Sequence, residues 1–330
     1  MTVIEPFEPF VGLHCETTAT TNLLRHAGLP VSEPMVFGLG EGLSFAVLVF
    51  KNAPAPFIAG RSRPEQVTRT LAETLGIELD VRQTRSPARA WRNIADAVDA
   101  GRPVAAKLDA HFLDYYSGDH FAGHYLAVYG YDDDCVCVVD SMAGVQRVHR
   151  DSFEKARLWR GPMASNALTW TVTAVSAVDW PTAVRAAIAG NSADYLNPPI
   201  RSFGARGIRK AAELAPRWVD TIPEPSTQLP LMAHLMEHGG TGGGLFRAIY
   251  RDFLLEVAER LGSLELKRCA ALFDQAADLW TQVAAALDRA GHQGTPSLQH
   301  AADLMSRVAD VEESAFTRLA DWAGPPSARS

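Results

Sequence analysis

The sequence predicts an α+β protein whose second half is mainly helical. Short apolar runs with strand-like spacing fill the first half, including a hairpin over 123–131 and 135–140. A segment of helical spacing, 15–27, precedes them, and the second half is rich in Ala, Leu and charged residues at helical intervals. We therefore predict a domain over 1–178, in which an N-terminal helix packs on an antiparallel sheet, and a helical domain over 179–330.

The elements of the first domain are predicted from their apolar periodicity. Leu23, Leu24 and Ala27 form the apolar stripe of the first helix, and Gly28 followed by Pro30 ends it. The remaining predictions are helices over 64–75 and 87–99, strands over 43–50, 77–83, 103–108, 144–149 and 168–175, and loops over 37–43 and 109–122.

Composition limits the function classes. The chain has 330 residues, 47% of them hydrophobic, and a net charge of -7. The acidic balance argues against a nucleic-acid partner. No run approaches the roughly 20 apolar residues of a membrane span, and the N-terminus lacks the basic and apolar regions of a signal peptide. We therefore expect a cytoplasmic protein that contacts no membrane and has no structural disulfides.

Among the four cysteines, Cys15 has the surroundings of a nucleophile. Cys135 and Cys137 lie two apart in an apolar run, and Cys269 lies in an Ala/Leu-rich helical pattern, so all three are predicted to be packing residues. Cys15 instead begins the first helix within a polar segment. Unpaired N–H groups at a helix N-terminus favour a thiolate and can face a developing oxyanion.

A base and a carboxylate follow at a compatible spacing. His124 begins one strand of the hairpin and Asp140 ends the next, 140 − 124 = 16 residues later. A turn near 132–133 brings the two positions almost opposite each other, so the carboxylate can orient the imidazole. Each residue alone has a plainer explanation, as a core residue or a turn former. The order of nucleophile, base and orienting carboxylate is that of a papain-like fold, and it predicts a Cys15–His124–Asp140 triad.

Several segments resemble the butirosin biosynthesis protein H-like family. They occur in the family's order: 14–19, 22–24, 35–43, 123–131, 240–247 and 250–254. The resemblance implies a papain-like N-terminal domain, similar to peptidases that process leader peptides, and a family-specific C-terminal domain.

The resemblance also implies an activity. The butirosin member takes an aminoacyl group from an acyl carrier protein thioester and attaches it to an amine of an aminoglycoside. By analogy, Cys15 would carry the acyl group, His124 would move the proton, and Asp140 would hold the imidazole. The phosphopantetheine belongs to the donor, so no cofactor of the chain's own is expected; the partners would be an acyl carrier protein and a small-molecule amine.

One position departs from the papain-like pattern. Such peptidases usually place a glutamine, an oxyanion donor, about six residues before the cysteine, where this chain has Pro9. The second oxyanion donor is therefore open; His14 or another backbone N–H would have to serve. This departure favours transfer from an activated thioester over cleavage of a peptide bond.

Substrate contacts are predicted near the triad and in the second domain. The candidates are His14, Tyr115, Tyr116, His120, Gly242 and Arg247. The glycines at 239–244 also suit a close-packed turn between domains. Six Asp and His side chains gather within 109–124, but the segment contains Gly118 and Gly123, so helical ligand spacing is lost and no metal is predicted. A basic stretch over 201–217 is a candidate docking face for an acidic carrier protein.

The predicted function is amide-forming acyl transfer through Cys15 in specialised metabolism. A hydrolase with the same triad (a peptidase, amidase or thioesterase) or a macrocyclase is the nearest alternative, because it shares the acyl-enzyme. A catalytically inactive protein that binds a carrier protein or ligand is the third. The sequence leaves open whether the chain forms a homodimer.

Overall fold

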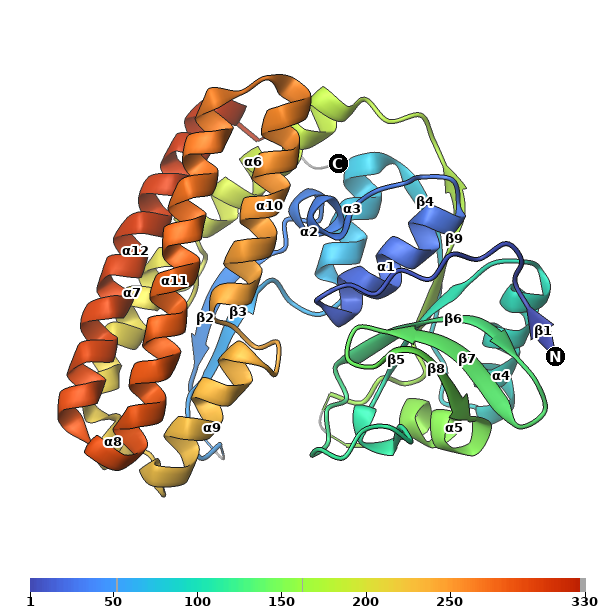
Figure 1. Cartoon of the computed structure of the whole chain (residues 1–330), viewed down its shortest axis with the longest axis horizontal. Coiled ribbons are helices and arrows are strands. Elements are labelled where there is room, and N and C mark those ends of the chain that lie inside the picture. Colours follow the sequence, from blue (N-terminus) through green and yellow to red (C-terminus); the bar gives the residue numbers. More distant parts are fainter. Residues whose placement is uncertain (52, 162, 327–330) are drawn as a thin grey trace. The chain divides into compact units, whose positions relative to one another are not determined.

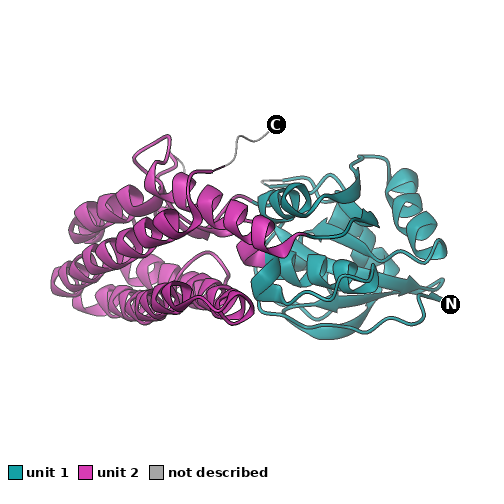
Figure 2. Cartoon of the chain, turned by 90° about the horizontal axis from the view of Figure 1, so that it is seen from above, with its two compact units in different colours: residues 1–36, 64–178 teal, residues 37–63, 179–330 magenta. Residues whose placement is uncertain are grey.

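A computed structural model describes residues 1–51, 53–161 and 163–326 (Figure 1). The chain divides into two compact units (Figure 2). Unit 1 comprises residues 1–36 and 64–178, and unit 2 comprises 37–63 and 179–330. The predicted α+β class is confirmed. The segment 37–63, which the predicted first domain included, groups with the helical unit instead.

Unit 1 is built on an antiparallel sheet. In the described residues the order is β4-β9-β5-β6-β7-β8, with β1 paired to β6 as a seventh strand. The strands are β1 (Thr2–Val3), β4 (Ile77–Arg82), β5 (Val104–Leu108), β6 (His124–Tyr131), β7 (Cys135–Asp140), β8 (Gly144–His149) and β9 (Thr169–Val175). All but β1 lie where the sequence predicts strands.

Helices cover both faces of this sheet. They are α1 (Cys15–His26), α3 (Gln66–Leu75), α4 (Pro87–Asp99), the short 3-10 helix η1 (Ala110–Phe112) and α5 (Arg150–Leu158). Ile94 of α4 and Phe153 of α5 share an apolar core with Leu126 of β6. Successive strand residues point to opposite faces, and the hydroxyl of Tyr125 donates to Glu65, the residue just before α3. Helix α3 therefore lies on the other face.

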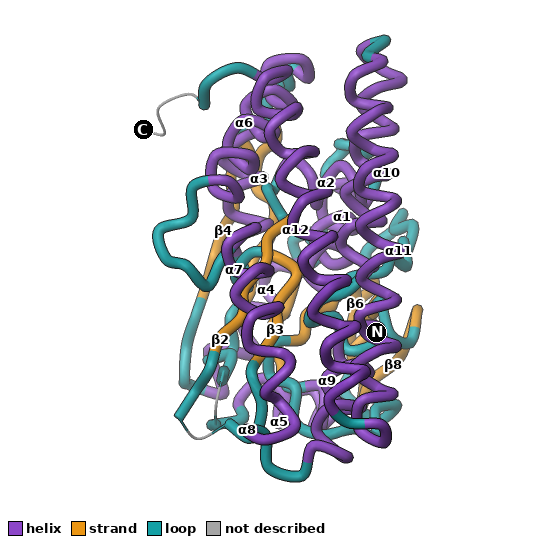
Figure 3. The backbone as a smooth tube through the Cα atoms, turned by 90° about the vertical axis from the view of Figure 1, so that its left-hand side faces the viewer, coloured by secondary structure: helices purple, strands orange, loops and turns teal. Residues whose placement is uncertain are grey.

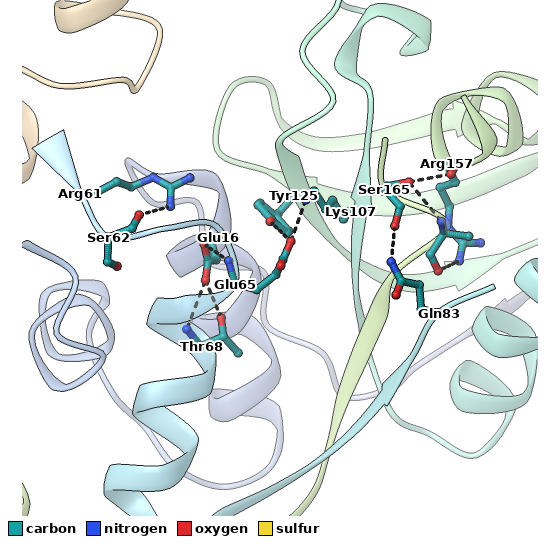
Figure 4. Close-up of polar contacts among 11 residues, drawn as sticks. Glu16, Arg61, Ser62, Glu65, Thr68, Gln83, Lys107, Tyr125, Arg157 and Ser165 are labelled. Carbon is teal, nitrogen blue, oxygen red and sulfur yellow. Dashed lines mark hydrogen bonds and ion pairs between the residues drawn. The ribbon is translucent and has the colours of Figure 1, made fainter. Parts of the chain in front are cut away.

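A buried polar network fastens α1 to α3 (Figure 4). Glu16 is fully buried, and its carboxylate accepts from the N–H and hydroxyl of Thr68 and from the N–H of Glu65, each at 3.2 Å. It thereby caps the N-terminus of α3. Glu65 in turn accepts from Lys107 at 2.7 Å and from the Tyr125 hydroxyl at 2.8 Å. Burial would raise the pKa of Glu65, but Lys107 and Tyr125 hold it below its ordinary value.

Unit 2 consists mainly of helices, and its β2–β3 hairpin comes from the 37–63 segment. Figure 3 shows α11 and α12 running side by side. The elements are β2 (Leu43–Leu48), β3 (Phe57–Arg61), α6 (Trp180–Leu196), α7 (Gly204–Leu214), η2 (Ala215–Arg217), α8 (Trp218–Thr221), α9 (Pro225–Glu237), α10 (Gly244–Leu261), α11 (Leu264–Gln293) and α12 (Thr295–Ala323). None of the described helices combines the length and apolar character that a membrane span requires.

Local sequence signals missed a helix at the start of this segment. Helix α2 (Glu33–Leu39) crosses the division between the units and occupies part of the predicted glycine loop. Gly38 lies inside the helix, and a Cβ there would fall about 2.1 Å from the ring of Phe253. This glycine therefore serves close packing, a tertiary requirement that the sequence pattern does not distinguish from a turn. The sequence likewise missed α5 and β3.

Specific contacts fix the hairpin within unit 2. Phe45 stacks on Trp280 with ring centroids 5.3 Å apart. The side chain of Asn191 donates to the Leu43 carbonyl at 2.8 Å. These contacts explain why the segment groups with the helices.

A buried ion pair anchors the core of unit 2. Arg247 and Glu312 are both fully buried, and the guanidinium donates to the two carboxylate oxygens at 2.7 and 2.9 Å. Trp280 and Tyr195 also donate to Glu312, and Arg247 reaches the Gly60 carbonyl at 3.1 Å. The predicted substrate contact at Arg247 is therefore corrected, because its guanidinium is committed to the protein interior.

Removal of the Glu312 charge should strongly destabilise the protein. In Glu312→Gln the buried guanidinium of Arg247 loses its counter-charge, which we expect to lower the free energy of unfolding by about 3–5 kcal/mol. Chemical denaturation followed by circular dichroism measures this loss. Glu213→Gln is the control, because its exposed pair with Arg201 should contribute under about 1 kcal/mol. Equal effects of the two changes would contradict the anchoring role.

Candidate active site

Cys15 is the first residue of α1. The preceding His14 is extended, with φ −125° and ψ 132°, and the first helical bond runs from the Thr18 N–H to the His14 carbonyl at 2.8 Å. The Cys15 N–H is therefore one of those that have no acceptor within the helix. The thiol is nearly buried, with 8% of the residue exposed. The predicted position at a helix N-terminus is confirmed.

His124 and Asp140 form a buried hydrogen-bonded pair. The Nε2 of His124 lies 2.8 Å from Asp140 Oδ2, and the two residues are 1% and 0% exposed. A carboxylate can only accept, so Nε2 carries a proton. The second carboxylate oxygen accepts from the Met142 N–H at 2.8 Å. The base and its orienting group are thus brought together, as the spacing predicted.

The register of β6 and β7 makes this contact diagonal. Val128 pairs with Val138 and Ala127 with Val139, after a β-bulge near Tyr129. If this register continues, Asp140 lies opposite Leu126, two residues after His124. The prediction placed the pair almost opposite each other, and the register offsets them by two residues. Alternate residues share a face, so the diagonal neighbours still meet.

The pair favours the charged imidazole. Burial alone would lower the pKa of His124, but the charge and hydrogen bond of Asp140, with a further contribution from Cys15, raise it to about 10. Burial would raise the pKa of Asp140, yet His124, the Met142 N–H and Tyr115 hold it below its ordinary value. The site therefore keeps an imidazolium beside a carboxylate at neutral pH.

The second imidazole nitrogen of His124, Nδ1, is not bonded to Asp140. His124 Nδ1 is buried and has no hydrogen-bond partner among the described residues. Cys15 nevertheless contributes to the raised pKa of His124, which places the thiol in its immediate surroundings. Nδ1 is accordingly the nitrogen that can exchange a proton with Cys15.

Tyr115 contacts the triad carboxylate. Its hydroxyl donates to Asp140 Oδ2 at 2.5 Å from the loop between β5 and β6. Burial and the charge of Asp140 raise the pKa of Tyr115, so it remains a donor. The sequence predicted Tyr115 as a substrate contact and gave no signal for its bond to Asp140, because that bond depends on how the loop folds back.

His14 is held by the protein on both sides. Its N–H donates to Glu33 Oε1 at 2.9 Å, and its Nδ1 lies 3.2 Å from the Thr17 hydroxyl. The suggestion that the His14 N–H completes the oxyanion site is therefore wrong, because Glu33 occupies it. Nothing in the sequence pattern marked Glu33 as part of the site.

The other predicted substrate contacts lie in the β5–β6 loop and in unit 2. Tyr116 is half-buried in the β5–β6 loop, and His120 is exposed, with its Nδ1 2.6 Å from the buried carboxylate of Asp109. Gly242 lies in unit 2, where its Cα would be 2.8 Å from a Cβ placed at Gly60. The glycine loop thus packs on β3 within that unit, and this contact joins segments that the sequence assigned to different domains.

Two of the three remaining cysteines are buried. Burial raises the pKa of Cys137, and it raises that of Cys269 to about 11. All four thiols are free, Cys135 among them. In the part of the chain that the structure describes, no three His, Cys, Asp or Glu side chains are grouped as metal ligands.

Two protein-family models match the chain. The first is described as butirosin biosynthesis protein H, N-terminal, and matches residues 14–141, a range that contains all three triad residues. The second is described as a domain of unknown function (DUF4872) and matches residues 151–319, about half of the chain. No curated protein matches the sequence.

The charge state of His124 should persist well above neutral pH. In the wild type, 15N NMR of labelled histidines should show the His124 imidazolium from about pH 6 to 9, with its loss centred near the pKa of about 10. In Asp140→Asn the contribution of Asp140 is lost and only that of Cys15 still opposes burial, so the pKa of His124 should fall well below its wild-type value. The His124→Gln spectrum assigns the signal. A wild-type midpoint near 6.5 would contradict the pair.

The same shift fixes the direction of the pH dependence of stability. The folded pKa of His124 lies above its ordinary 6.5, so the contribution of the pair is complete below pH 6.5 and is lost as pH rises toward about 10. On the acid side, the contribution of Asp140 is present above its ordinary 3.8 and is lost as pH falls through its lowered folded pKa. Denaturation of the wild type and Asp140→Asn across pH measures both limbs.

Proposed function

This chain belongs to the butirosin biosynthesis protein H-like family, and we propose that it is a cysteine acyltransferase of specialised metabolism. The observation that carries this proposal is the buried His124–Asp140 pair beside Cys15 at the start of α1. A raised imidazole pKa next to a thiol suits proton exchange between the two. The early nucleophile helix and the later strand pair are consistent with a papain-like arrangement.

The first half-reaction forms an acyl-enzyme. With the thiol proton already on His124 Nδ1, Sγ of Cys15 attacks the acyl carbon of a phosphopantetheine thioester. The bond from that carbon to the pantetheine sulfur then breaks, and the departing thiolate takes the proton from His124. The N–H groups at the start of α1 stabilise the oxyanion that develops between these steps.

The second half-reaction releases the product. An uncharged amine attacks the acyl carbon on Cys15 and gives one proton to His124. The carbon–Sγ bond breaks, an amide leaves, and the enzyme returns to its thiolate–imidazolium pair. Asp140 and the Tyr115 hydroxyl keep the imidazole oriented throughout. Water in place of the amine would make the protein a hydrolase, and an amine of the same acyl chain would make it a macrocyclase.

The donor and acceptor classes rest on the family's association with butirosin biosynthesis. We propose an acyl carrier protein as donor and a small-molecule amine as acceptor, with Tyr116, His120 and Gly242 as substrate contacts. A carrier docking face on 201–217 receives less support, because several of its cations already have acidic partners: Arg201 pairs with Glu213, and Arg209 with Asp310 and Glu313. A cytoplasmic location stays a prediction, and a homodimer stays open.

Intact-protein mass spectrometry tests the covalent step. Wild type mixed with acyl-pantetheine thioesters should gain one acyl mass, and Cys15→Ala should gain none and lose at least about 1,000-fold in turnover. Addition of amines should discharge the adduct as an amide. The control is Cys137→Ala, which should still be acylated because it leaves Cys15 intact.

Each other outcome has a defined meaning. Discharge at the same rate without amine would make the protein a hydrolase, and a cyclic product would make it a macrocyclase. Turnover retained in Cys15→Ala would remove the nucleophile. Absence of any adduct across a varied thioester panel would favour the binding-protein alternative.

A further inference from the structure

The backbone just before Cys15 donates hydrogen bonds to one carboxylate. Glu33, in the first turn of α2, is 3% exposed and belongs to unit 1. Its Oε2 accepts from the Leu13 N–H at 2.8 Å, and its Oε1 accepts from the His14 N–H at 2.9 Å. The hydroxyls of Thr17 and Thr18 lie 2.7 and 3.4 Å from Oε1. Four donors from six consecutive residues therefore converge on one side chain.

The number and type of donors match an ionised carboxylate. Such a group accepts at about four lone-pair positions and donates none, and bonds to a charged acceptor are stronger than neutral ones. The N-terminal ends of α1 and α2 both favour a negative charge at this point. The packing is also close: a Cβ at Gly12 would lie 2.6 Å from both Glu33 Oε2 and Thr18 Oγ1.

The same hydrogen-bond network includes the peptide bond between His14 and Cys15. The carbonyl of His14 accepts from the Thr18 N–H at 2.8 Å and lies 3.1 Å from the Thr17 hydroxyl. A trans peptide is planar, so the orientation of this carbonyl also sets the direction of the Cys15 N–H. Glu33 thus holds the backbone of His14 directly at its N–H and, through the Thr17 hydroxyl, indirectly at its carbonyl.

We propose that Glu33 is a positioning residue that aims the Cys15 N–H at the oxyanion of the acyl-transfer step. This inference rests on the proposed acyl transfer. It assigns no contact with substrate to Glu33, whose effect passes through the backbone of His14. Small displacements of such a donor weaken catalysis of a reaction that develops an oxyanion, but they matter little for a reaction that develops none.

That difference supplies the test. The wild type and Glu33→Gln are compared in two reactions of Cys15: acylation by an acyl-pantetheine thioester, which forms an oxyanion, and alkylation by iodoacetamide, which does not. Glutamine retains one acceptor oxygen but places an amide N–H₂ against the Leu13 or His14 N–H. We expect acylation to slow about 10- to 100-fold and alkylation to change by less than about 3-fold.

A matched control separates positioning from loss of folding. Asn22 in α1 grips the same lead-in segment, since its side chain exchanges two hydrogen bonds with Phe10 at 2.9 and 2.8 Å. It does not bond Leu13 or His14, so Asn22→Ala should lower both rates only in proportion to the folded fraction, which circular dichroism measures. If Glu33→Gln fails to fold, Thr17→Val carries the test, with the same selective loss on a smaller scale.

The outcomes distinguish the two proposals. Equal loss of acylation and alkylation in Glu33→Gln or Thr17→Val, or no loss in either, overturns the role of Glu33 while wild-type acylation still supports the transferase. Absence of an acyl adduct on the wild type overturns the proposed function, and the inference falls with it.

Discussion

Helix α1 begins inside the protein, and one buried carboxylate holds the backbone that leads into it. Every residue from His14 to Thr18 is buried. Buried backbone N–H groups without a partner are costly, and the first turn of a helix has four of them without an intrahelical acceptor. The surrounding chain supplies carboxylates close by. Glu33 accepts a hydrogen bond from the backbone N–H of His14 just before the helix, whereas Glu16 caps α3.

This constraint explains why Cys15 differs from the other thiols. Burial among apolar side chains raises the pKa of Cys137 and Cys269, whereas Cys15 begins a helix next to an imidazole. That imidazole is itself polarised, because Asp140 receives bonds from His124, Met142 and Tyr115 in a site closed to water. The low dielectric strengthens each of these bonds, so a single buried carboxylate orients the base and sets its charge.

Unit 2 uses the same physical solution for a structural purpose. Glu312 accepts from Arg247, Trp280 and Tyr195 in a fully buried cluster. The cluster joins α6, α10, α11 and α12, and through the Gly60 carbonyl it also joins β3. A buried pair of this kind specifies which surfaces meet more than it adds to stability. The bond from Arg247 to Gly60 is therefore one reason why the β2–β3 segment packs with the helical unit.

The sequence by itself determined the α+β class, nearly all strands of unit 1, the helix start at Cys15 and the choice of His124 and Asp140, because apolar periodicity, glycine stops and hairpin spacing are local. Tertiary structure decided the rest. Position 38 requires glycine because the ring of Phe253 fills the space beside it, and the 37–63 segment joins unit 2 through contacts with residues far along the chain. Arg247 is a core residue and Tyr115 contacts Asp140 for the same reason. Glu33 reaches His14 across 19 residues, and the partner of a buried polar group depends on where the folded chain brings it, which no short pattern encodes.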